Sequence, residues 1–95
     1  MSAREEVFTE VLSRGDVLVE RIVSTGQSTP ADKPHRQAHD EWVLLLAGSA
    51  RLRIEGEDER NLRPGDHVFI AAHRRHWVTW TAENEPTIWL ALHFR

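Results

Sequence analysis

The residues best suited to chemistry lie in one short stretch, HRQAHDEW, at positions 35–42. In an extended chain successive side chains point to opposite faces, so every second residue of this stretch shares a face. That face carries His35, Gln37, His39 and Glu41. Imidazole and carboxylate groups are donors that borderline divalent metals prefer, so the stretch is a candidate metal site. A surface loop that runs into a strand is the alternative, because any polar strand shows this spacing.

Glu41 is the most informative member of the stretch. It begins the apolar run EWVLLLAG, in which Val43 and Leu45 share its face and must be buried if the run is a central strand. A carboxylate at the rim of such a face is partly desolvated and needs a cation, a hydrogen-bond donor or a proton. Two possible partners, His73 and His76, lie just beyond the apolar strand within PGDHVFIAAHRRH, where the chain would return to the same end of a barrel.

Strands are the elements that would position these residues. DVLVERIVSTG (16–26) is rich in β-branched residues, ARLRIEG (50–56) alternates apolar and charged residues, and PTIWLALHF (86–94) closes the chain. About six or seven short strands with regularly spaced turns predict an all-β sandwich or barrel. We expect a single domain over residues 1–95.

The N-terminal segment differs from the rest of the chain. EEVFTEVLSR (5–14) is the one stretch with helical periodicity, although its Phe8, Val11 and Leu12 could equally dock an irregular arm. We expect residues 1–15 to form an arm that packs on the barrel.

Composition excludes several classes of function. The 95 residues include no cysteine, so disulfides, thiolate metal ligands and a cysteine nucleophile are ruled out. The formal net charge is −3 and the basic residues are scattered, which argues against a nucleic-acid partner. No apolar run approaches the roughly 18 residues of a membrane span, and the acidic N-terminus is unlike a signal peptide. We expect a cytoplasmic protein that binds a small-molecule ligand or substrate, without a nucleic-acid or membrane partner.

Two stretches, DEWVLLLAG and LRPGDHVFIAAHRRH, together resemble the paired signature of the cupin superfamily. In its first motif, G-x5-H-x-H-x3,4-E-x6-G, Glu41 and Gly48 match the Glu and the final Gly, and counting back places His35 and Gln37 at the histidine positions. In its second motif, G-x5-P-x-G-x2-H-x3-N, Gly65 and His76 match at the expected separation.

The departures from these motifs concern the ligand set. Gln37 stands where a histidine ligand is usual, and Ala71, His73 and Trp80 replace the usual proline, glycine and asparagine. An amide is a poor ligand for zinc or iron, so Gln37 could instead orient a metal-bound water. His39 is the alternative to Gln37 as the metal ligand that the second histidine of the motif would supply.

The resemblance implies a double-stranded β-helix (jelly-roll) barrel of the small single-domain bacterial cupin type. At its mouth it implies a mononuclear divalent ion, Zn, Mn, Fe or Ni, which the sequence does not rank. The implied ligands are His35, Glu41 and His76, with Gln37 or His39 completing the shell. The residues expected to line the pocket are Val43, Val78 and Trp80.

The implied function is a metal-dependent enzyme acting on a small molecule, of the dioxygenase, isomerase or epimerase class. Glu41, or a nearby imidazole, would move protons in catalysis. The alternative is a non-enzymatic cupin that binds or senses a small ligand, with or without a metal.

Other residues receive structural interpretations. A homodimer is expected, because WVLLLA (42–47) is apolar on both faces and the outward face needs a cover. Trp42 and Trp89 are interpreted as core or interface residues. His67 and His93 are interpreted as surface or packing histidines.

Overall fold

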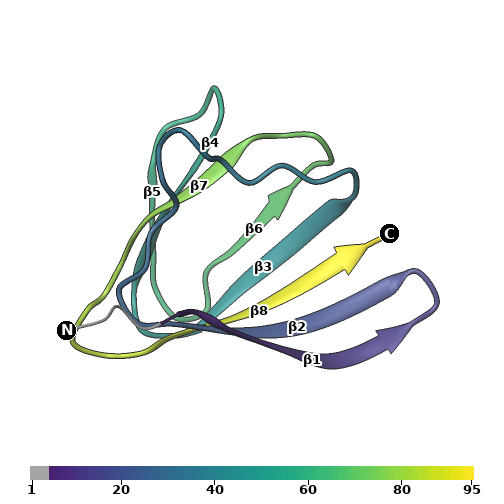
Figure 1. Ribbon diagram of the computed structural model, residues 1–95, viewed down its shortest axis with the longest axis horizontal. Helices are drawn as coiled ribbons and strands as arrows, with labels where there is room; N and C mark the ends of the chain where they lie inside the picture. The colour runs from purple at the N-terminus through teal and green to yellow at the C-terminus, as the bar shows by residue number, and fades with distance from the viewer. Residues whose placement is uncertain (1–4) are drawn as a thin grey trace.

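A computed structural model describes residues 5–95, and these residues form strands, turns and loops with no helix (Figure 1). No segment among them is therefore a helix long and apolar enough to cross a membrane. The strands are β1 (Val7–Arg14), β2 (Val17–Ser24), β3 (Asp40–Ala47), β4 (Ala50–Ile54), β5 (Arg60–Leu62), β6 (His67–Ile70), β7 (His76–Thr81) and β8 (Thr87–Phe94).

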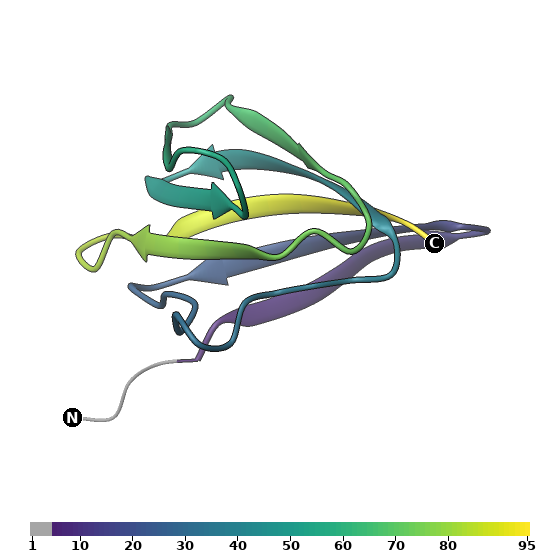
Figure 2. The same ribbon diagram turned by 90° about the horizontal axis from the view of Figure 1, so that it is seen from above.

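The strands form two sheets. Five pair in the order β1-β2-β8-β3-β6 and three in the order β5-β4-β7, and each printed pairing is antiparallel. The predicted all-β jelly-roll barrel is confirmed. In both views the β1–β2 turn lies beside the C-terminus (Figures 1 and 2), where the amide of Arg95 donates to the carbonyl of Asp16 at 2.7 Å.

Alternation along the strands builds the core. On β3, Val43 and Leu45 are buried while Trp42 and Leu44 are half-buried, as expected for side chains on opposite faces. Trp89 and Ala91 of β8 continue the same inward face. The buried apolar cluster is Val43, Leu45, Ala50, Leu52, Ile54, Leu62, Val68, Ile70, Trp89 and Ala91.

Gly48 allows the turn from β3 to β4 to cross the start of β8. Its φ is +84°, and a Cβ there would lie 2.6 Å from the Cα of Thr87. Only glycine fits both the dihedral angle and the close approach. The glycine that ends the first motif is thus required by packing between strands.

The segment 7–14 corrects the N-terminal prediction, because it is a regular strand rather than a helix or an irregular arm. β1 pairs with β2 along its length, with a register shift between Glu10 and Leu12. The bulge at Val11 puts apolar residues at uneven spacing, which imitates helical periodicity. Residues 1–4 of the expected arm lie outside the described residues.

Candidate acid–base site in the barrel cavity

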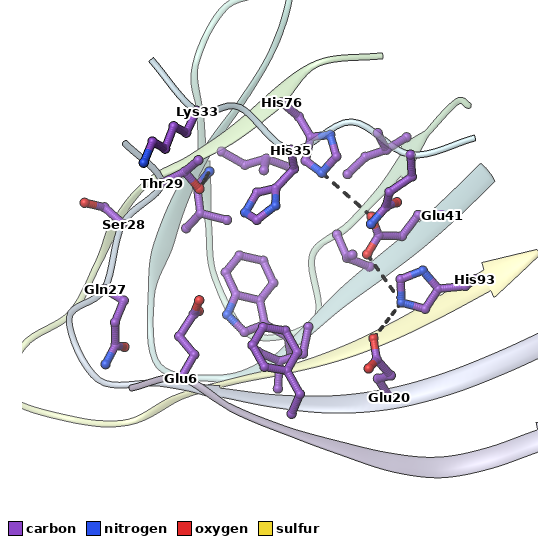
Figure 3. Close-up of a pocket in the computed structure, with 18 of the residues that line it drawn as sticks. Glu6, Glu20, Gln27, Ser28, Thr29, Lys33, His35, Glu41, His76 and His93 are labelled. Carbon is purple, nitrogen blue, oxygen red and sulfur yellow. Dashed lines mark hydrogen bonds and ion pairs between the residues drawn. The ribbon is translucent and has the colours of Figure 1, made fainter. Parts of the chain in front are cut away.

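A cavity of about 260 Å³ opens between the two sheets (Figure 3). Side chains of both sheets and of the loop between β2 and β3 line it. Its apolar wall includes Ile22, Val43, Leu52, Ile70, Val78 and Trp89. A small, mostly apolar cavity with a few polar groups is the usual form of a small-molecule site.

Glu41 and His76 face each other in this cavity from opposite sheets (Figure 3). The Oε1 atom of Glu41 lies 3.8 Å from Nε2 of His76, and the two side chains are 7% and 6% exposed. This separation is too long for a hydrogen bond. Within residues 5–95 the Glu41 carboxyl makes no hydrogen bond, so it remains available to a ligand.

Burial shifts both groups toward their uncharged forms. Desolvation raises the pKa of Glu41 above its usual 4.5, with His93 opposing the shift and Glu20 adding to it. Desolvation lowers the pKa of His76 below its usual 6.5, with the hydrogen bond to Arg74 opposing the shift. A cavity that penalises charge therefore holds a potential proton donor opposite a potential acceptor.

One backbone contact sets the tautomer of neutral His76. Its Nδ1 atom lies 3.1 Å from the carbonyl oxygen of Arg74. A carbonyl oxygen only accepts hydrogen bonds, so Nδ1 carries the proton and Nε2 presents its lone pair. The nitrogen that faces Glu41 is thus the basic one.

Glu20 and His93 extend the site, and neither was among the sequence-predicted site residues. Nε2 of His93 lies 2.8 Å from Oε1 of Glu20 and 3.9 Å from Oε2 of Glu41, while Nδ1 lies 3.0 Å from Nε2 of His39. His93 was interpreted from the sequence as a surface or packing histidine. It is buried rather than on the surface, and it contacts polar groups as well as packing. Its parity with Trp89 and Ala91 was a signal that it faces inward, but the sequence does not pair it with Glu41.

The first-motif residues divide between cavity and surroundings. His35 lines the cavity, and its backbone exchanges two hydrogen bonds with His76, at 2.9 and 3.0 Å. Gln37 also lines the cavity. His39 is not part of the lining and lies against the ring of His93 instead.

Of the residues expected to line the pocket, Val43 and Val78 do so and Trp80 does not. Trp80 is 40% exposed, and the guanidinium of Arg51 lies over its ring. The register shift between Arg51 and Leu52 explains the difference, because it makes Thr79 the extra residue of β7 and breaks the alternation that joins Val78 to Trp80.

The donor types suit the predicted metal ion, but their arrangement does not form a metal site. Among the described residues no three His, Asp or Glu side chains converge closely enough to hold an ion. Oε1 of Glu41 lies 3.8 Å from Nε2 of His76, and Oε2 lies 3.9 Å from Nε2 of His93. The rings of His35 and His76 are 5.5 Å apart.

Comparison with known proteins identifies relatives of the whole barrel. The model of the family described as "Cupin domain" matches residues 18–93. A protein of Ralstonia eutropha JMP134, provisionally named a mannose-6-phosphate isomerase, is 43% identical with a TM-score of 0.93, over 97% of this chain and 86% of that one.

Two more distant structures share the fold. A cupin superfamily protein of Desulfitobacterium hafniense DCB-2 is 18% identical with a TM-score of 0.78, over 99% of this chain and 83% of that one. An RmlC-like cupin of Methanocaldococcus jannaschii, with a double-stranded β-helix, is 15% identical with a TM-score of 0.76, over 97% and 82%. No curated protein matches the sequence.

Proposed function

The chain belongs to the cupin domain family, and from that premise we propose that it is an isomerase-class enzyme acting on a small polar molecule. The observation that carries the proposal is the pair formed by Glu41 and His76, two buried titratable groups 3.8 Å apart that face one cavity. Titratable groups shifted by desolvation within a cavity are typical of catalytic sites. The name of the 43% identical relative, an isomerase, agrees with this class.

The arrangement suits proton transfer next to a carbonyl group. The lone pair on Nε2 of His76 takes a proton from the carbon beside the substrate carbonyl, and the C–H electron pair forms a C=C bond. The carbonyl oxygen takes the proton of the Glu41 carboxyl, which leaves an enediol or enol between a carboxylate and an imidazolium. The imidazolium of His76 then returns its proton to the former carbonyl carbon. The hydroxyl on the other carbon of the enediol gives its proton to the Glu41 carboxylate and becomes the new carbonyl, which completes the isomerisation.

Solvent-proton exchange tests this proposal. In D₂O we expect the protein to introduce deuterium beside the carbonyl of small aldoses or ketoses, followed by NMR. Glu41→Gln and His76→Asn should each slow exchange by about 100-fold or more, because each removes an acid–base group. His73→Asn, which changes an exposed histidine outside the cavity lining, is the matched control. Binding without exchange would instead favour the non-enzymatic cupin.

The predicted Zn, Mn, Fe or Ni ion remains a second candidate feature of this enzyme. It is favoured by Nε2 of His76, which is unprotonated in the neutral ring, as a metal ligand must be, and which lies 3.8 Å from the Glu41 carboxyl. Metal analysis of protein purified without a tag or added metal tests it. About one equivalent per chain, lowered by Glu41→Gln and His76→Ala, would support a metal enzyme, and less than about a tenth would contradict it.

A further inference from the structure

The side of the cavity opposite Glu41 and His76 carries a second carboxylate, that of Glu6 (Figure 3). The hydroxyl of Ser24 donates to Oε2 of Glu6 at 2.5 Å, and Nε1 of Trp89 donates to the Ser24 oxygen at 3.2 Å. Ser24 and Trp89 are 0% and 4% exposed. A chain of hydrogen bonds that starts in the core therefore orients the Glu6 carboxylate.

Aromatic side chains flank this carboxylate. Phe8 and Trp89 line the same cavity as Glu6, and Phe8 is 56% exposed. A carboxylate accepts hydrogen bonds from hydroxyl groups, while an aromatic face packs against C–H groups. Together they suit a small molecule that has hydroxyls on one side and a C–H surface on the other.

The charge of the cavity selects against anions. Besides Glu41, which the proposed reaction uses in its protonated form, the lining carries the carboxyl groups of Glu6 and Glu20 but one ammonium group, that of the exposed Lys33. Repulsion by fixed charge is stronger in a partly desolvated cavity than in water. A phosphate ester entering this space would meet more negative than positive charge.

We infer that Glu6, with Phe8 and Trp89, forms a recognition subsite for an uncharged, hydroxyl-bearing substrate such as a free monosaccharide, and that the cavity discriminates against its phosphate ester. The inference rests on the proposed function, whose substrate class it names. It is supported independently by Glu41, which is 6% exposed, makes no hydrogen bond within residues 5–95 and points into the same cavity.

Binding of matched ligand pairs tests the subsite. Free pentoses and hexoses are compared with their own phosphate esters by ligand-observed NMR and calorimetry. We expect at least one free sugar to bind about tenfold or more tightly than its ester. Glu6→Gln should weaken that sugar about tenfold, because the hydroxyl loses a charged acceptor. Glu5→Gln removes the same charge from the exposed neighbouring residue and should leave affinity unchanged.

A second variant should improve the binding of phosphate esters relative to the free sugars. Glu6→Lys should lower the preference for the free sugar by about tenfold or more, because it replaces a repulsive charge with an attractive one. Esters that bind as tightly as the free sugars, wild-type affinity in both Glu6 variants, or binding of none of these sugars would overturn the inference. Sugar binding that depends on Glu6 but occurs without deuterium exchange would contradict the proposed isomerase and support the subsite. Deuterium exchange that does not depend on Glu6 would support the isomerase and contradict the subsite.

Discussion

At the scale of single residues, the site is defined by groups whose ionisation the cavity opposes. The side chains of Glu41 and His76 are 7% and 6% exposed, and burial opposes ionisation of both. Such groups cost folding free energy when they ionise, and the protein tolerates this cost where the groups serve a reaction. The cost has a distinct pH dependence for each residue.

The raised pKa of Glu41 predicts that Glu41→Gln stabilises the metal-free protein at high pH. A folded-state pKa above the unfolded value of about 4.5 makes wild-type stability fall as pH rises through the folded pKa. The variant lacks this loss, so its advantage should be near zero at about pH 4 and reach about 1 kcal/mol at about pH 8. Urea unfolding of chelator-treated protein measures it. An advantage that shrinks as pH rises would contradict the assignment.

The lowered pKa of His76 predicts the opposite dependence and a defined tautomer. Its contribution to stability is present above the unfolded value of 6.5 and is lost as pH falls through the folded pKa. Nitrogen-15 NMR should find His76 neutral just below pH 6.5, protonated on Nδ1 and bare on Nε2. A proton on Nε2 in the neutral ring would remove the proposed base.

At the scale of elements, small irregularities in strands decide which side chains reach the cavity. The bulge in β7 turns Trp80 outward, while the bulge in β1 leaves Val11 unpaired. The β3–β4 turn depends on Gly48, whose neighbours leave no room for a side chain. Bulges and close backbone contacts re-aim side chains in this way in many sheets.

Alanine substitutions at two glycines with nearly equal φ distinguish the cost of backbone strain from the cost of steric crowding. Gly48→Ala should lower the free energy of unfolding by about 3 kcal/mol or more, because its Cβ would meet backbone of Pro86 and Thr87 at 2.7 and 2.6 Å. Gly56→Ala, at φ +83° with nothing within 4 Å, should cost about 1 kcal/mol. Chemical unfolding of both variants measures the difference. Equal losses would show that the close approach to β8 has no effect.

At the scale of the whole molecule, the outward face of the five-stranded sheet is largely apolar. Cross-strand partners share a face, so the pairs Trp42–Phe69, Trp42–Leu92 and Leu44–Leu90 lie together on the side away from the cavity. Phe69 is 55% exposed, and the other members of these pairs are half-buried. A face of this kind is a candidate interface, which keeps the predicted homodimer as a proposal.

Sedimentation measurements test the dimer. We expect the wild type to sediment as a dimer and Leu90→Glu, which places a charge in the centre of this face, to sediment as a monomer with an unchanged far-ultraviolet spectrum. Trp80→Glu makes a comparable change on the exposed side of the other sheet and should remain dimeric. A monomeric wild type would contradict the homodimer.

The sequence by itself determined the all-β class, the cupin family and the residue types of the site. Alternation marked Val43 and Leu45 as inward, and the resemblance to the paired cupin motifs pointed to Glu41 and His76. These signals are local, because side-chain direction in a strand follows from a period of two residues. Local periodicity therefore predicts which face a side chain occupies, but not what lies opposite it.

Only the tertiary structure decided which side chains meet. Pairing of β8 with both β2 and β3 brings His93 between Glu20 and Glu41, residues far apart in the chain. In the folded barrel His39 lies against His93, whereas Gln37 lines the cavity. Strand register and bulges set these contacts. They arise from packing across the whole barrel, so no spacing within one segment encodes them.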